Sequence, residues 1–312
     1  MEHTATEGSR GWLRAAGLTA VLGALSVVNP AVLLAGPLGL LILSVSPRRL
    51  SALVVGVLAV LVIIGGDPSS GLWYLERGWA LIVGGWFVAL TLRWPEKGFL
   101  PRGLGALAGA FAAVTLLLRV RPGDWAVVDW AVASRMEAGM AAALGLIRTR
   151  VGPGAVSGTF EARALEVMAL QGLIFPALLG LATLSGLGLA WWLYVRLNRI
   201  PHTGIGPLKE FRFNDQLVWV LILGLLVALA SSGLWERFGT NAVVFMGALY
   251  TLRGVAVVLF LAGGVSLFGG ILLALGLLLL TPVLVAGAFV IGLGDTWLDL
   301  RNRRREPSLP QA

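Results

Sequence analysis

The chain has 312 residues and a mean hydropathy of +0.87; 57% of its residues are hydrophobic and only 13% are charged. A soluble domain carries about 25% charged residues, because it needs a polar surface to stay in solution. Half that share leaves too little polar surface for a globule of this length. The composition therefore excludes an ordinary soluble protein.

The net charge of +8 does not indicate nucleic-acid binding. The basic residues lie in short segments between apolar blocks and in the C-terminal tail, as is typical of cytoplasmic loops that face anionic lipid. No basic run is interleaved with aromatic residues in the manner of a base-stacking surface. The absence of cysteine excludes disulfides and thiolate chemistry.

The apolar residues fall in long blocks without the alternation of a barrel strand. A helix needs roughly 20 apolar residues to cross a bilayer, and only helices or closed barrels satisfy their backbone there. We therefore expect an all-α, polytopic integral membrane helix bundle with about eight or nine transmembrane helices. One further helix is expected to be amphipathic and to lie at the membrane interface.

In chain order, residues 1–11 are polar and predict a flexible cytoplasmic N-terminus. The apolar run that follows is interrupted at Asn29–Pro30. Because proline disfavours helix at the residue before it, we expect a tight hairpin of two short helices. These expected helices and the later spans of the N-terminal membrane bundle, 12–120, cover residues 12–28, 31–45, 51–65, 79–92 and 103–118, with a polar stretch at 66–78.

Residues 121–163 differ from the rest. Apolar residues recur there every three or four positions, which predicts one apolar face of an amphipathic helix. These positions are Trp125, Val128, Val132, Met136, Met140, Ala143 and Ile147. We expect an extracytoplasmic helix at the bilayer interface or capping the bundle, followed by a loop at 152–158.

The C-terminal membrane helices are expected within 164–298, and a basic, disordered tail at 299–312. The expected spans are 164–195, which contains Pro176, then 215–234, 241–262 and 269–293. Placing the loops 46–50, 93–102 and 196–213 in the cytoplasm collects nine arginines and lysines there. The N-terminus then also lies on the cytoplasmic side. We expect the protein in the bacterial cytoplasmic (inner) membrane. The same count leaves the side of the tail open.

The sequence offers no pattern for common chemistry. Its two histidines stand apart from any second ligand, so no metal site is expected. Neither a P-loop nor a nucleophilic serine motif is present. We therefore predict no catalytic residues, no cofactor and no enzymatic activity.

Polar residues inside apolar runs are costly and therefore informative. Arg253 is the clearest, and it predicts either a counter-charge for an anionic substrate or acidic group, or a side chain that snorkels to the surface. Asn241 is the first residue of the expected span 241–262, and it is either a binding residue or a helix cap. Glu166 belongs either to an ion cluster with Arg163 or to a wet helix end. Asp215 lies in a cap group that begins at Asn214.

Small residues recur every four positions at Ala16, Ala20 and Ala24. This spacing lets helix backbones approach closely. It indicates either internal packing or a docking face for a separate membrane subunit.

The C-terminal third resembles the YybS-type family of bacterial membrane proteins, whose function is not established. The likeness rests on Asn241 and Gly254, and on a segment in which Gly292-Leu-Gly-Asp295 is followed by Trp297, Asp299 and Arg301. Arg253 stands where that family would be expected to carry a neutral polar residue.

The first half, from Arg10 to about Gly66, is similar in layout to substrate-binding S-components of energy-coupling-factor vitamin transporters. It has a small-residue first helix, a proline-containing second segment and a basic turn, Ser46-Pro-Arg-Arg49. The resemblance implies that Ala16, Ala20 and Ala24 would dock on a coupling subunit.

Two functions follow as hypotheses. The first is a small-molecule-binding or transport-related membrane subunit, whose partners are the lipid bilayer and a membrane coupling subunit. The alternative is a non-catalytic scaffold or assembly subunit of an envelope complex.

Overall fold

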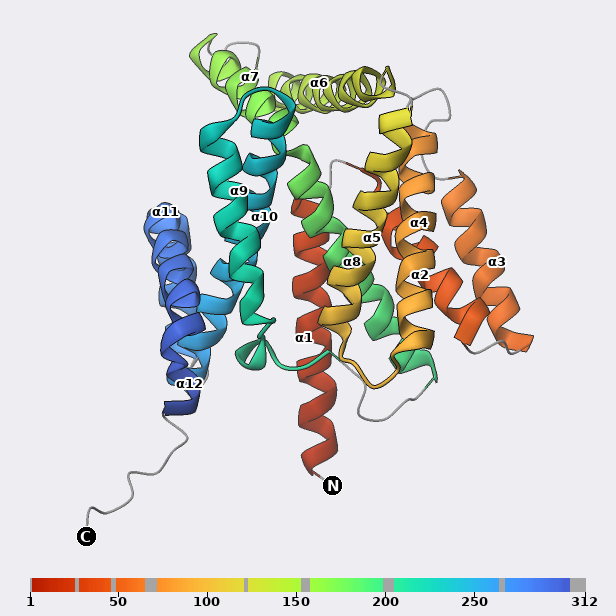
Figure 1. The fold of residues 1–312 in the computed structure, drawn as a ribbon, viewed down its shortest axis with the longest axis vertical. Coiled ribbons are helices and arrows are strands. Elements are labelled where there is room, and N and C mark those ends of the chain that lie inside the picture. The colour runs from red at the N-terminus through yellow and green to blue at the C-terminus, as the bar shows by residue number, and fades with distance from the viewer. Residues whose placement is uncertain are drawn as a thin grey trace. The chain divides into compact units, whose positions relative to one another are not determined.

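The structure is a computed structural model that describes residues 2–25, 28–45, 49–64, 72–120, 123–152, 158–198, 205–263 and 267–303. Every regular element in these ranges is helical, which confirms the all-α prediction. The chain divides into two compact units, residues 1–205 and 206–312. Figure 1 labels the helices of both.

Several helices are long and apolar enough to cross a membrane. In the described part of the chain there are five: α4 (Leu72–Arg93), α5 (Phe99–Val120), α8 (Phe175–Asn198), α10 (Leu234–Leu261) and the segment Leu279–Leu298 of α11 (Leu267–Leu298). Three further segments are apolar but shorter, Gly11–Leu25, Pro30–Val45 and Asp215–Ala230. These helices are those of a membrane protein with several spans.

Unit 1 is a bundle around α8. Helices α1 (Glu2–Leu25), α2 (Pro30–Val45) and α5 pack on α8, while α3 (Arg49–Ile64) and α4 pack on α2. The indole N–H of Trp79 donates to the hydroxyl of Thr183 at 2.9 Å, which ties α4 to α8 in the buried core. A Cβ at Gly186 would stand 3.0 Å from the carbonyl oxygen of Leu33, so glycine permits α2 to lie close to α8.

The start of the chain differs from prediction in two ways. The helix break at Asn29–Pro30 is confirmed, yet α1 and α2 do not pair as a hairpin, since α1 packs on α8 and α2 packs on α4, α3 and α8. The amide of Asn29 donates to Glu76 of α4 at 3.0 Å, and this bond holds the break against another helix. Residues Glu2 to Gly11, expected as loose chain, belong to α1.

The expected span 164–195 is wrong as one helix. The structure has α7 (Gly158–Leu173), a turn at Ile174, and then α8. Pro176 has no N–H to donate to the carbonyl of Gly172, so the hydrogen-bond ladder is interrupted there. Proline is favoured in the first turn of the helix that follows. Hydropathy alone does not register this break because both sides are apolar.

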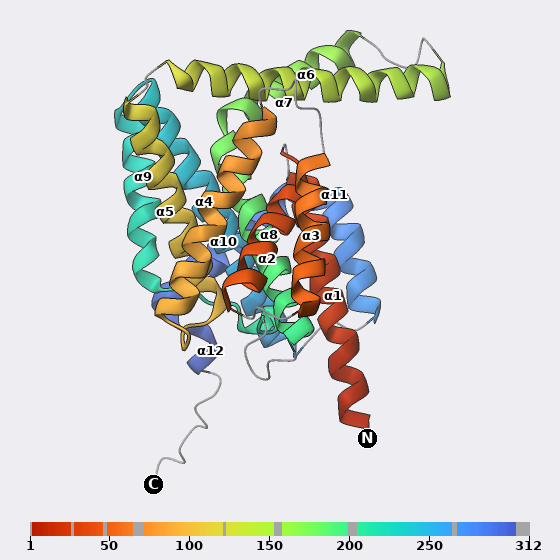
Figure 2. The same ribbon diagram turned by 90° about the vertical axis from the view of Figure 1, so that its right-hand side faces the viewer.

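Helix α6 (Asp124–Val151) lies crosswise to the bundle of unit 1, over the end of α4 and α5 (Figure 2). Ala131 and Val132 are buried, and α6 packs on α4 and α7. The predicted helix between 121 and 163 is thus present. The expected loop falls largely at 153–157, and most of the tail at 304–312, both outside the described residues.

Unit 2 contains two short 3-10 turns, η2 (Leu208–Glu210) and η3 (Asp215–Leu217), then α9 (Val218–Ala230), α10, α11 and α12 (Leu300–Arg303). Helix α10 begins at Leu234, seven residues before the expected start at Asn241. The unit also starts later than the expected domain 164–298, because α8 packs on α1, α2 and α5 within unit 1.

Glycines set the close crossing of α10 and α11. A Cβ at Gly254 would collide with the backbone of Ala288, and one at Gly292 would collide with the backbone of Tyr250. Helix α11 also bends at Leu280, which has φ −127° and ψ 26°, two residues before Pro282. The two backbones can therefore touch only while both crossing positions lack a side chain.

We predict that Gly254→Ala separates α10 from α11 and lowers the unfolding free energy by about 1–3 kcal/mol, the usual cost of overpacking. The measurement is an SDS-induced unfolding midpoint in detergent micelles. Gly287→Ala on α11 is the matched control, because no described atom lies within 4 Å of its new Cβ. Equal stability of the two variants would show that the crossing is not close.

Candidate functional site

A buried ion pair lies where α10 crosses α11. The Nε of Arg253 donates to Oδ2 of Asp295 at 2.9 Å, and both side chains are 0% exposed. The alternative in which Arg253 snorkels to the membrane surface is therefore wrong, and the alternative of an acidic partner is confirmed. The glycine crossing one residue after Arg253 brings the two side chains into reach.

Asp295 also binds the arginine of the following turn. The Nη2 of Arg301 donates to the same Oδ2 at 2.9 Å, and its Nη1 donates to the carbonyl of Phe211 at 3.1 Å. Arg301 can turn back because Asp299, between α11 and α12, has a φ of +42°. This left-handed conformation, uncommon outside glycine, ends α11 and separates it from α12.

Asp215 joins the cluster from the start of α9. Its Oδ1 accepts from Nη1 of Arg253 at 2.6 Å, and its Oδ2 accepts from Nη2 of Arg212 at 3.1 Å. Arg212 reaches Asp299 as well, at 3.3 Å. The side chains of Arg212, Asp215 and Asp299 are 39–40% exposed, so they form the open side of the cluster.

The electrostatics of this open side favour both charged forms. Arg253 and Arg212 both donate to the carboxylate of Asp215, so two guanidiniums stand against this one acid. The hydrogen bond to Asp215 raises the pKa of Arg212. Contact between opposite charges favours the ionised form of each partner.

We call the six residues Arg212, Asp215, Arg253, Asp295, Asp299 and Arg301 the Arg253 network. Among the described residues, three of its buried polar atoms have no hydrogen-bond partner: Nη2 of Arg253, Nε of Arg301 and Oδ1 of Asp295. The hydroxyls of Tyr250 and Thr296 are buried beside it. The guanidinium of Arg253 also lies 5.4 Å from the ring centre of Phe213. The network thus retains hydrogen-bonding capacity.

The other predicted site residues lie elsewhere. Asn241 is inside α10 and donates to the carbonyl of Arg237 at 2.8 Å, so it is not a cap, and it stands twelve residues, or about 18 Å, along the helix from Arg253. Glu166 belongs to unit 1, where it lies in the middle of α7 and forms an exposed ion pair with Arg163 at 3.7 Å, so the alternative of a helix end is wrong. Asn214 caps η3 by accepting from the amide of Gln216.

The small-residue positions Ala16, Ala20 and Ala24 are all exposed in unit 1. Helix α1 buries Ala15 and Leu22 instead and packs on α8. Internal packing in the described residues therefore does not account for the alanine spacing.

The sequence analysis did not predict a second buried ion pair, which lies in unit 1. Glu76 and Arg77 were expected in a polar stretch, but α4 starts at Leu72 and buries both. Their side chains approach to 3.8 Å, and Arg77 stacks on Trp73 at 3.8 Å from the ring centre. Trp73 and Trp79 on either side were the available signal, since tryptophans near span ends mark a membrane boundary.

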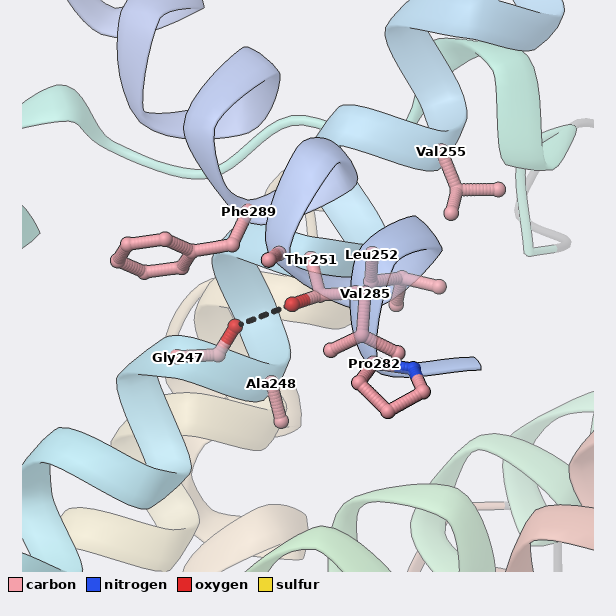
Figure 3. Close-up of a pocket in the computed structure, with 9 residues that line it drawn as sticks. Gly247, Ala248, Thr251, Leu252, Val255, Pro282, Val285 and Phe289 are labelled. Carbon is pink, nitrogen blue, oxygen red and sulfur yellow. Dashed lines mark hydrogen bonds between the residues drawn. The ribbon is translucent and has the colours of Figure 1, made fainter. Parts of the chain in front are cut away.

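An apolar groove runs between α10 and α11 (Figure 3). It has a volume of about 590 Å³, and its walls include Ala248, Val285 and Phe289. The one hydroxyl on its wall, that of Thr251, donates to the carbonyl of Gly247. The groove offers hydrocarbon contact, so the polar site of unit 2 is the Arg253 network.

No group of three or more histidine or acidic side chains placed to hold a metal ion occurs in the described ranges. In the Arg253 network, each of the three carboxylates accepts from at least one guanidinium.

An all-helical fold, several helices able to span a bilayer and a buried ion network define a multi-pass integral membrane protein. A family model described as predicted membrane protein (DUF2232) matches residues 128–296, more than half of the chain. The chain belongs to this family. The match includes Arg253, Gly254 and Asp295 and ends before Asp299. Comparison with curated proteins and with solved structures gives no match.

We predict that Arg253→Met lowers the unfolding free energy by about 3 kcal/mol, because it leaves the buried carboxylate of Asp295 short of a donor. Adding Asp295→Asn should cost less than the sum of the two single changes. Arg163→Met, which breaks an exposed pair, is the control and should cost under about 1 kcal/mol. SDS unfolding of all four variants measures the coupling. Strict additivity would contradict the contact.

Proposed function

We propose that this chain is a small-molecule-binding, transport-related subunit of the bacterial cytoplasmic membrane, with the Arg253 network as its polar binding site. The observation that carries the proposal is the fully buried Arg253, whose Nη2 has no partner in the described residues. Ionisable groups inside a membrane bundle are costly and usually mark a ligand or ion pathway.

The backbone around the network supports the same function. The segment from Phe211 to Asn214 is irregular, and α11 ends at Leu298, directly before Asp299. Interrupted helices expose backbone polar groups, and transporters use them at binding sites. The break at Asn29–Pro30 in unit 1 has a similar character.

Energy would come from another subunit, since the sequence has no nucleotide-binding motif. The exposed Ala16, Ala20 and Ala24 offer a docking face for it. The S-component-like layout of the first half is consistent with that division of labour, and it is a resemblance from sequence only.

The proposed topology has about eight or nine spans, with the short apolar segments crossing beside the five long helices. The N-terminus would be cytoplasmic and α6 would lie in the opposite interface. In both views of unit 1, the start of α1 and helix α6 are at opposite ends of the bundle (Figures 1 and 2). A helix crosswise to spanning helices fits the interfacial position.

Ligand binding is tested by thermal stability of the purified protein in detergent. We expect at least one compound from a panel of vitamins, metabolites and metal salts to raise the melting temperature of the wild type. The same compound should give no shift with Arg253→Met, and it should still act on Arg163→Met. A panel without any Arg253-dependent shift would remove the support for binding at the network.

The alternative function is a scaffold or assembly subunit of an envelope complex. It is favoured by the exposed alanine face, and by the charge compensation of the network, which a purely structural tie would also show. A single cysteine at Ala20, in a chain that has none, permits crosslinking in cells, with a cysteine at the exposed Val57 as control.

We expect Ala20-specific crosslinks to one membrane protein under either function. Dependence of the crosslink on the stabilising compound identifies the transport-related subunit. A crosslink of constant yield, together with a silent ligand panel, identifies the scaffold.

A further inference from the structure

We infer that the Arg253 network takes a polar solute without net charge, which offers both hydrogen-bond donors and acceptors. This inference rests on the proposed binding function of the network. The first observation is the charge balance. Three arginines, Arg212, Arg253 and Arg301, face three aspartates, Asp215, Asp295 and Asp299, and each residue has an opposite partner within 3.3 Å.

The second observation is the chemical mixture of the unpartnered atoms. Nη2 of Arg253 and Nε of Arg301 are donors, whereas Oδ1 of Asp295 is an acceptor. All three belong to side chains that are more than nine-tenths buried. A ligand that satisfies them must therefore accept at one point and donate at another.

Charged ligands conflict with this arrangement. An anion bound by the free guanidinium nitrogens would stand beside the unpartnered carboxylate oxygen of Asp295. A cation bound by that oxygen would stand beside Arg253 and Arg301. In both cases a compensated, poorly solvated cluster would acquire an unpaired charge. An amide or hydroxyl group meets donors and acceptors together and adds no charge.

Access to the network lies on its half-exposed side. Arg212 bridges Asp215 and Asp299 there, and its side chain is 39% exposed. Because this bridge is solvated, it costs little to open. Opening of this bridge is the proposed route by which a small solute reaches Arg253 and Asp295.

The test uses three isosteric probes: acetamide, which is neutral, acetate, which is an anion, and acetamidinium, which is a cation. Saturation-transfer NMR on the detergent-solubilised full chain measures each affinity. The signal assigned to the network is the part lost in Arg253→Met. We expect acetamide to bind at least about tenfold more tightly than either charged probe.

Two charge-altering variants at the solvated bridge sharpen the test. Asp215→Asn leaves the network with one excess positive charge and should raise the affinity for acetate by about tenfold. Arg212→Gln leaves one excess negative charge and should raise the affinity for acetamidinium in the same proportion. Arg163→Gln, in the exposed pair of α7, should change neither affinity.

Preference of the wild type for acetate or acetamidinium would overturn the inference while leaving the proposed binding function in place. The absence of an Arg253-dependent signal from acetamide would also overturn it. The binding function itself fails only if the panel of vitamins, metabolites and metal salts is silent as well. Unchanged selectivity in both bridge variants would show that charge balance does not choose the ligand.

Discussion

Unit 2 depends on the pairing of Arg253 with Asp295. Two fully buried charges in an apolar helical unit are tolerable only if each compensates the other. Their contact requires the backbones of α10 and α11 to cross closely. The crossing depends on Gly254 and Gly292, because a Cβ at either position would collide with the other helix. The same pair then recruits Asp215 from the start of α9 and Arg301 from α12. One electrostatic requirement thus links four separate segments of the chain.

The two units share a physical principle although their residues differ. In unit 1 a buried carboxylate, Glu76, accepts from the amide of Asn29 where the chain breaks between α1 and α2. In unit 2 a buried guanidinium lies where α9 begins and α11 ends. Both charges stand where helices are interrupted, because those places supply the unpaired backbone groups and irregular geometry that a charge needs in a low-dielectric surrounding.

The sequence predicted the features that depend on local composition. Helical spans, the break at Asn29–Pro30 and an acidic partner for Arg253 all follow from hydropathy, proline chemistry and the cost of a buried charge. Features that depend on tertiary contacts were missed. Asp215 follows Asn214 in a cap pattern, so its bond to Arg253, 38 residues away, left no local sign. Arg102 was counted as a loop charge, yet it is buried in α5 over the ring of Trp191.

Asp299 combines two roles that chemistry can separate. Its backbone holds the left-handed conformation between α11 and α12, from which Arg301 reaches Asp295, and its carboxylate accepts from Arg212. A glycine would suit the turn and abolish the carboxylate, whereas a glutamate would preserve the acid and resist the backbone angle. Any relative of this chain that carries glycine here would keep the left-handed turn but leave Arg212 with one carboxylate instead of two. The exposed side of the Arg253 network would then be closed by one ion pair, between Arg212 and Asp215.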